Sequence, residues 1–398
     1  MVMLKYVFPA LVAVGSVSAS CSVSATTTLQ NAGDAAALTT CSTFSGSIAI
    51  ATSTSDNIAI NGVEEITGGL DCTGAPNITQ IGADSLQKIG DDFTLNNVQT
   101  LQTLSFPQLS QVGSIDWQGL PNLATLMMDT EIQDTDSLNI QNTFLSSLQG
   151  INLKRCNTFI LANNRMLQDV TLQLQNVTGA ITFESNGNRL SVDFPNLKSA
   201  QNITFRNVPA ISIPSLASVN GSLSFIENDG LQNISCPNLT RLDQSLSINT
   251  NSALKSFSFP QLQTVKGAVN VENNTALGSI SFPKLTTIFG AFDAYGNFSK
   301  VSLPAISDVR GAFNIQSSKD ISSDCSTFSN EQGPNDVIKG DYQCAGSQTR
   351  PGDANTTPSG TSSSGGSSGK TGAAGHIEIP ATALTGVLGV LAAMVGML

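Results

Sequence analysis

The sequence predicts an all-β fold, a right-handed parallel β-solenoid of about 13 rungs, each about 22 residues long. Three observations support this fold: a steady repeat of one apolar position, strand-like alternation around it, and an Asn that follows it at a fixed distance. We call the repeated apolar position the marker, and successive markers lie 20–23 residues apart. The markers are Ile48, Leu70, Phe93, Ile115, Leu138, Phe159, Ile181, Ile203, Leu223, Leu246, Val269, Phe292 and Phe313.

Each marker begins an alternating triplet. The residue two positions later is also apolar, as in Ile48 and Ile50, and the residue between them is mostly polar or small. This period of two is that of a strand with one face inward and the other outward. A Phe-Pro-x-Leu motif and a Gly precede several triplets, as in Phe259–Leu262 before Gly267. We expect its Pro to begin a second short strand, where a missing N–H costs little.

An Asn lies five residues after many markers. Asn tolerates the left-handed turn conformation, and its amide can hydrogen-bond along a column of stacked rungs. The predicted column consists of Asn164, Asn186, Asn228, Asn251, Asn274 and Asn297.

The solenoid is expected over residues 46–322, between an N-terminal cap at 20–45 and a C-terminal cap at 323–345. One short helix candidate, Leu29–Leu38, precedes the first rung. The rungs at Leu138 and Phe159 lack the Phe-Pro motif, so a division into two lobes would fall there. The sequence leaves open whether the solenoid has one lobe or two.

Residues 1–19 have the features of a secretory signal peptide. Lys5 supplies the positive charge, an apolar run follows from Tyr6 to Val14, and small residues lead to cleavage after Ala19. The alternative is a membrane helix, but this run is too short to span about 30 Å of hydrocarbon.

The C-terminal end is typical of a GPI-attachment signal. A Gly/Ser/Thr-rich stretch, predicted as a flexible stalk over 346–372, precedes an uncharged tail that ends without Lys or Arg. We expect lipid attachment at Gly372 and removal of the propeptide 373–398, with Ala373 and Gly369 as alternative attachment sites. A plain disordered tail would not need the terminal apolar block.

Secretion predicts N-glycosylation. We expect Asn202 to point outward and accept a glycan more readily than Asn297, whose amide would be used in the Asn column. The sequons are Asn77, Asn176, Asn202, Asn220, Asn233, Asn238, Asn273, Asn297 and Asn355.

The cysteines fit an oxidising compartment. Terminal rungs need caps, so we pair Cys21 with Cys41 before the first rung and Cys325 with Cys344 after the last. Cys72 and Cys236 occupy inward positions seven rungs apart, too far to be bridged, and we predict buried thiols. Cys156 is left unassigned. No C-x-x-C spacing suggests a metal site.

Composition excludes several functions. The only His, His376, lies in the tail, which argues against a Ser–His–Asp site or a His-ligated zinc in the folded body. The net charge of −11 argues against nucleic acid. We therefore expect no cofactor, no nucleic acid partner and no small-molecule substrate.

Three functions remain: a non-enzymatic surface scaffold, a polysaccharide-remodelling enzyme, and a glycan-binding module. An enzyme needs carboxylates that converge, and the outward Asp116 and Asp293 lie eight rungs apart. The other acidic candidates are Glu184 and the doublets Asp91-Asp92 and Glu64-Glu65. A glycan-binding module needs exposed aromatic rings, of which we expect only Tyr295, because Trp117 is predicted to be buried.

The segment Leu38–Ile50, which contains Cys41 and Gly46, resembles the first turn of receptor L domains. In that family an upstream Cys pairs with this one, which supports the Cys21–Cys41 pair. A likeness to ligand receptors rests on the fold alone. The whole chain resembles fungal GPI-anchored cell-wall organisation proteins of the extracellular-mutant type. The resemblance rests on the signal peptide, the rungs, the Ser-rich stalk and the tail segment Gly372–Glu378.

This second resemblance implies a role in wall assembly and integrity. It also implies attachment to the outer leaflet of the plasma membrane through a GPI lipid, or to the wall, with glucan or mannoprotein as partners. It carries over no catalytic residue.

Overall fold

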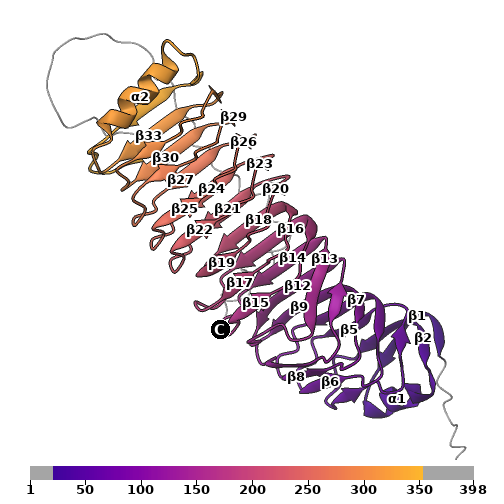
Figure 1. Ribbon diagram of the computed structural model, residues 1–398. Coiled ribbons are helices and arrows are strands. Elements are labelled where there is room, and N and C mark those ends of the chain that lie inside the picture. The colour runs from indigo at the N-terminus through magenta and orange to yellow at the C-terminus, as the bar shows by residue number, and fades with distance from the viewer. Residues whose placement is uncertain (1–20, 353–398) are drawn as a thin grey trace, which may run out of the picture. The chain divides into compact units, whose positions relative to one another are not determined.

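The marker residues form one uninterrupted ladder in the computed structural model, which describes residues 21–352 (Figure 1). Each marker pairs in parallel with the next, from Ile48 beside Leu70 to Phe292 beside Phe313. The predicted parallel β-solenoid is therefore confirmed. The marker strands are β2 (Thr43–Ile50), β5 (Leu70–Thr73), β7 (Lys88–Asn96), β9 (Gln111–Leu120), β12 (Ser137–Thr143), β14 (Thr158–Ala162), β16 (Asn176–Glu184), β18 (Ser199–Arg206), β21 (Leu223–Ile226), β24 (Leu246–Asn249), β27 (Val269–Glu272), β30 (Phe292–Gly296) and β33 (Phe313–Ser317).

Just before each marker the chain forms a shorter pairing segment, which we call the approach strand. In β2, β7, β9, β16 and β18 it is continuous with the marker strand, and in the other rungs it is separate. Approach and marker strands, together with β1 (Ser22–Leu29) and β34 (Tyr342–Ala345), form a 23-stranded sheet. The separate approach strands are β4 (Glu65–Ile66), β11 (Ile132–Asp134), β13 (Ile151–Cys156), β20 (Ser218–Val219), β23 (Arg241–Leu242), β26 (Thr264–Val265), β29 (Thr287–Ile288) and β32 (Asp308–Val309).

Shorter strands line a second face of the coil in four small sheets. The first sheet ends at β10 and the next begins at β15, because the rung of Leu138 has no short strand; the sheets are also separate between β19 and β22 and between β25 and β28. The marker strands β9, β12 and β14 stay paired across the rung of Leu138, so the solenoid is continuous there. These short strands are β3 (Ile58–Ala59), β6 (Gln80–Gly82), β8 (Thr103–Ser105), β10 (Thr125–Met127), β15 (Asp169–Thr171), β17 (Ser191–Asp193), β19 (Ala210–Ser212), β22 (Asn233–Ser235), β25 (Ser256–Ser258), β28 (Ile280–Ser281) and β31 (Val301–Ser302).

The core is a column of like side chains. Phe183, Phe205 and Phe225 occupy the same inward position of successive rungs, and their rings stack with centroids 5.5 and 5.6 Å apart. Because equivalent residues of adjacent rungs lie side by side, one inward Phe places the next within stacking distance.

The Phe-Pro motif lies elsewhere than expected. Phe106 is buried directly after the short strand β8, and Pro107 occupies the turn that follows, so the prediction that Pro begins a strand is wrong. Proline's fixed φ suits the first residues of such a turn, and its missing N–H removes no ladder bond there.

The Asn column exists and is buried. Asn251 Oδ1 accepts the Asn228 backbone N–H at 3.0 Å, and Asn251 Nδ2 donates to the Phe225 carbonyl at 3.0 Å. Asn164, Asn186, Asn228 and Asn274 donate in the same way to a carbonyl of the preceding rung. The Asn amides therefore hydrogen-bond to buried backbone N–H and C=O groups at the turn that follows each marker strand.

Asn297 does not belong to this column, so that part of the prediction is wrong. Strand β30 continues through Gly296, one residue further past its marker than β27 does. The turn is thereby displaced, Asn297 is exposed, and Phe298 is buried beside it.

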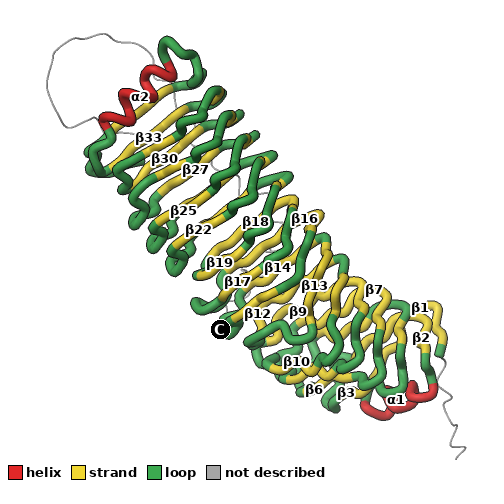
Figure 2. Tube along the Cα trace, viewed as in Figure 1, coloured by secondary structure: helices red, strands yellow, loops and turns green. Residues whose placement is uncertain are grey.

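Both ends of the stack are covered, as Figure 2 shows by the helices at its two limits. At the first rung β1 (Ser22–Leu29) pairs in parallel with β2, and α1 (Ala32–Ala37) and the 3-10 turn Leu38–Thr40 follow. After the last rung come α2 (Ser322–Gln332) and β34 (Tyr342–Ala345), which pairs with β33. These elements cover sheet edges that would otherwise expose unpaired backbone groups.

Disulfides fasten the covers in the pairs that the sequence predicts. Cys21 is bonded to Cys41 and Cys325 to Cys344, with Cα atoms 5.5 Å apart in each pair. Residues 346–352, expected to start a flexible stalk, instead pack on the last rungs, where Gln348 is buried and its backbone N–H donates to the Ser317 carbonyl at 2.9 Å. No helix within residues 21–352 is long and apolar enough to cross a membrane.

The Asn column predicts a large effect for Asn251→Ala. The substitution leaves the Asn228 N–H and the Phe225 carbonyl buried without their partner, at about 1–3 kcal/mol each. We expect the free energy of unfolding of the surrounding rungs, measured by native-state hydrogen exchange, to fall by about 2–4 kcal/mol. Asn270→Ala, on the outward face of the neighbouring rung, is the control and should change it little; equal effects of the two substitutions would contradict the column's role.

The disulfides predict a second contrast. Cys41→Ser removes a bond across a 20-residue separation and should lower the free energy of unfolding of the first rungs by about 2–5 kcal/mol. Cys72→Ala only removes a buried thiol and should cost less. Urea unfolding of both variants tests this, and a larger loss in Cys72→Ala would show that the Cys21–Cys41 bond is not what holds the N-terminal cover.

Candidate functional site

No catalytic constellation forms among the acidic side chains that the sequence singles out. Asp91 and Asp92 are both exposed, and Glu65 forms an ion pair with Lys88 at 2.8 Å. Glu184 is half-buried on the outward face. Within residues 21–352, no three His, Cys, Asp or Glu side chains converge as they would around a metal ion.

Asp116 lies in a small outward hydrogen-bond network. Gln118 Nε2 and Asn139 Nδ2 donate to the same Asp116 oxygen at 2.7 and 2.8 Å, and Gln141 Nε2 donates to Asn139 at 2.7 Å. Because adjacent rungs place these residues side by side, the carboxylate is held by neutral amides.

Asp293 lies in a matching network near the C-terminal end. Asn314 Nδ2 donates to Asp293 at 2.8 Å, and Gln316 Nε2 donates to Asn314 at 3.0 Å. Burial raises the pKa of Asp293, and the Asn314 hydrogen bond opposes this. Asp116 and Asp293 thus occupy separate networks, as the repeat register predicts.

Tyr295 is not the exposed ring that we expected. It is half-buried, its hydroxyl donates to Glu272 at 2.9 Å, and the backbone of Gly352 lies against its ring. The Gly352 N–H also donates to Gln316 Oε1 at 3.0 Å. Burial and the nearby Glu272 carboxylate raise the pKa of the Tyr295 phenol. The exposed aromatic rings within residues 21–352 are Phe144 and Phe289, and the Arg310 guanidinium covers Phe289 at 4.0 Å.

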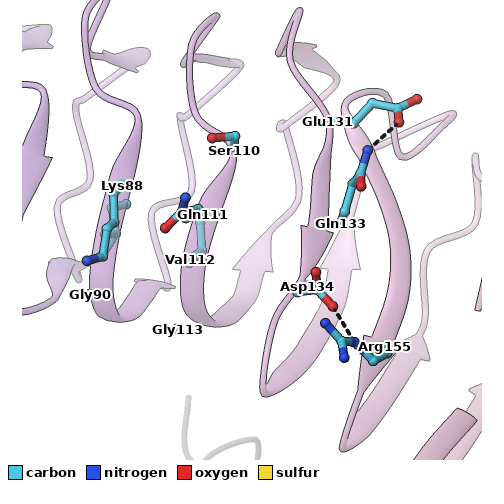
Figure 3. A pocket seen from close by; sticks show the side chains of 11 residues that line it. Lys88, Gly90, Ser110, Gln111, Val112, Gly113, Glu131, Gln133, Asp134 and Arg155 are labelled. Atoms are coloured by element: carbon cyan, nitrogen blue, oxygen red, sulfur yellow. Dashed lines mark hydrogen bonds and ion pairs between the residues drawn. The ribbon is translucent and has the colours of Figure 1, made fainter.

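A groove opens where the approach strands change neighbours (Figure 3). It consists of two hollows, of about 660 and 460 Å³, which share Val112, Gly113, Asp134 and Arg155. Figure 3 shows Lys88 and Gln111 on one side and Glu131, Gln133, Asp134 and Arg155 on the other. Of the residues singled out from the sequence, Cys156 and Asn176 line the second hollow, but neither was predicted to belong to a groove.

Hydrogen bonds fix the far side of the groove. Arg155 Nε donates to Asp134 at 2.9 Å, and this bond raises the pKa of the guanidinium further. Glu131 accepts from Asn152 at 3.1 Å and from Gln133 at 3.4 Å. Below them, the Gly113 carbonyl accepts the Asp136 N–H at 2.7 Å, which ties the two sides together.

One sequence signal accompanies the groove. The flanking marker intervals are 23 and 21 residues, and these rungs lack the Phe-Pro motif. The intervals lie within the range of the whole repeat, so they do not by themselves identify a groove.

The three remaining cysteines are free, buried thiols. This confirms the prediction for Cys72 and Cys236 and gives Cys156 the same state. Burial raises the pKa of each thiol to about 12, with the nearby Asp71 and Asp136 adding to the effect at Cys72 and Cys156. Such thiols remain protonated and are poor nucleophiles at neutral pH.

Seven of the sequon asparagines are exposed, and Asn202 is the exception among those described. Asn202 is half-buried, and its Oδ1 accepts the Ser222 N–H at 2.9 Å. The reason given for favouring Asn202 over Asn297 therefore fails, because it is Asn297 that is exposed. The exposed sequons are Asn77, Asn176, Asn220, Asn233, Asn238, Asn273 and Asn297.

The signal peptide, Asn355, Gly372 and His376 lie outside the described residues, as do the stalk beyond residue 352 and the propeptide.

Comparison with known proteins gives consistent matches. A family model described as Ecm33, GPI-anchored cell wall organization protein, matches residues 1–39. Protein ecm33 of Aspergillus fumigatus is 39% identical over 372 residues, 92% of each chain. A cell surface GPI-anchored protein of Arthroderma benhamiae is 36% identical over 88% of this chain and 89% of its own. Cell wall protein ecm33 of Schizosaccharomyces pombe is 37% identical over 78% of this chain and 73% of its own. No solved structure matches.

The buried thiols predict a pH dependence. A thiol exposed by unfolding ionises with its ordinary pKa near 9.0, whereas the pKa of each folded thiol is about 12, so the unfolded state loses protons first. The free energy of unfolding should therefore fall as pH rises from about 9 to about 12. A variant with Cys72, Cys156 and Cys236 all replaced by Ala should show a shallower fall in urea titrations, and identical slopes would contradict the assignment.

Proposed function

The chain belongs to the Ecm33 family of GPI-anchored cell wall organization proteins, and from this premise we propose that it is a non-enzymatic scaffold at the cell surface that maintains wall integrity. One observation carries the non-enzymatic part. The outward carboxylates lie in separate networks along the stack, and the best placed of them, Asp116 and Asp293, are held by amides.

A glycosidase works differently. It needs two carboxyl groups flanking one bond, one of them with a raised pKa so that it can donate a proton. The groove contains Glu131 and Asp134, but both side chains are exposed and Asp134 is paired with Arg155. Neither carboxylate is buried in the apolar surroundings in which the general acid of a glycosidase is usually held.

The rest of the proposal concerns attachment and modification. We assign GPI attachment to Gly372, after removal of the signal peptide 1–19 and the propeptide 373–398. N-glycans on the nine sequons would cover exposed turns of the solenoid. A long stack fastened at one end suits a spacer or platform among wall polymers, with glucan or mannoprotein as neighbours.

Two measurements test this proposal. Cells that lack the protein should become hypersensitive to wall-binding dyes and osmotic stress, because a scaffold is lost rather than a metabolic step. The protein released from cells by phosphatidylinositol-specific phospholipase should liberate no soluble sugar from wall glucan or chitin. Normal dye sensitivity would contradict the wall role, and soluble products would establish the polysaccharide-remodelling enzyme instead.

A further inference from the structure

We propose that the groove between β9 and β11 is a binding site for a neutral polysaccharide chain, an inference that rests on the proposed wall function and names its ligand class. The groove is a consequence of the fold. Approach strands elsewhere pair from rung to rung, as Glu65 with Lys88 and Arg241 with Thr264. Here the approach segment of β9 pairs with β7 on one side, and β11 pairs with β13 on the other. Within residues 21–352, no pairing joins β9 to β11.

The ladder is therefore open at one step while the marker strands beneath it stay paired. Thr135 Oγ1 and the Asp136 N–H both donate to the Gly113 carbonyl, at 2.9 and 2.7 Å, and fix the distance between the two sides at the base of the groove. A hollow that is built into a rigid sheet needs little ordering when a ligand binds, which favours affinity.

The dimensions fit a chain rather than an ion. The larger hollow, of about 660 Å³, lies within the range of about 300–1,000 Å³ that is usual for ligand sites. The second hollow continues it past Arg155 toward Cys156 and Asn176. The ligand can therefore enter at one end and leave at the other, as a segment of a polymer must.

The charges fit a neutral ligand. The larger hollow has two basic side chains, Lys88 and Arg155, and two acidic ones, Glu131 and Asp134. Lys88 and Arg155 are already paired with carboxylates, at 2.8 and 2.9 Å. Asp136 in the second hollow adds a further negative charge, which disfavours an anionic chain.

The hydrogen-bonding groups fit hydroxyls. Arg155 uses Nε for Asp134, which leaves its Nη donors for another acceptor. The exposed Gln111 amide offers both a donor and an acceptor, and the second carboxylate oxygen of Asp134 offers another acceptor. A sugar hydroxyl both donates and accepts, so a chain of hexoses can satisfy this mixture. Buried Ile89 and Val112 supply an apolar floor for the C–H face of a ring.

The experiment uses the phospholipase-released glycoprotein and three neutral probes: soluble oligosaccharides of β-glucan, of mannan and of chitin. Calorimetry should detect binding of at least one probe. Arg155→Gln removes the guanidinium, and Gln111→Ala removes the exposed amide without adding a ring on which a sugar could stack. Arg155→Gln should weaken binding at least about tenfold, as expected for loss of one charge-assisted hydrogen bond, and Gln111→Ala should weaken it less. Arg241→Gln is the matched control, because Arg241 occupies the same approach-strand position outside the groove and should bind as wild type.

Several outcomes would overturn the proposal. They are the absence of binding to all three probes, equal binding by Arg155→Gln and wild type, and a loss of binding in Arg241→Gln equal to that in Arg155→Gln. Binding that emerges only in Asn176→Gln, which cannot carry a glycan at the groove, would show that the protein's own sugar occupies the site. Cells that express Arg155→Gln and keep a normal wall would show that wall integrity does not depend on the groove, and that result would leave the scaffold function standing.

Discussion

The backbone ladder between equivalent residues of successive rungs is the interaction on which the rest of this structure depends. Parallel pairing at one register brings each residue beside its counterpart, so whatever one rung contains is repeated along the stack. Inward Phe residues become a stacked column, and inward Asn residues become a chain of amides that satisfies the backbone at every turn. The same rule makes stability a sum of local rungs and their interfaces. It also explains why a protein with only 6% aromatic residues maintains a continuous core.

A ladder has two ends, and both must be closed. The strands β1 and β34 add one further pairing at each end, a helix and a disulfide accompany each of them, and Asp324 on α2 accepts the Val301 N–H from within the last rungs at 2.8 Å. The segment 346–352 extends the C-terminal closure across Tyr295 and Gln316. Residues 346–352 are therefore held to the last rungs. Within residues 21–352 the disulfides lie only at the two ends, where the terminal strand is hydrogen-bonded to a neighbouring strand on one side only.

The outward face supports the proposed scaffold role. Its side chains are short and polar, and neighbouring rungs let amides and carboxylates satisfy one another. A general acid or base needs the opposite, a group that its surroundings leave unsatisfied or desolvated. The groove between β9 and β11 differs from the rest of this face, because there the rungs stop supplying partners to each other. This break in the repeat is why we place the proposed ligand site in this groove.

The sequence by itself determined the solenoid, its register and the two disulfides, because each follows from spacing along the chain. A period near 22 residues places Ile48 beside Leu70 whatever else the coil does. It could not determine the position of Asn297, the turn after Phe106, or the covering of Tyr295 by Gly352. The first two depend on the exact residue at which a strand ends. The covering of Tyr295 depends on a segment that is distant in sequence. Only the tertiary structure decided the groove. It forms because β9 and β11 do not pair with each other as other approach strands do, and strand pairing depends on two rungs together rather than on the sequence of either one.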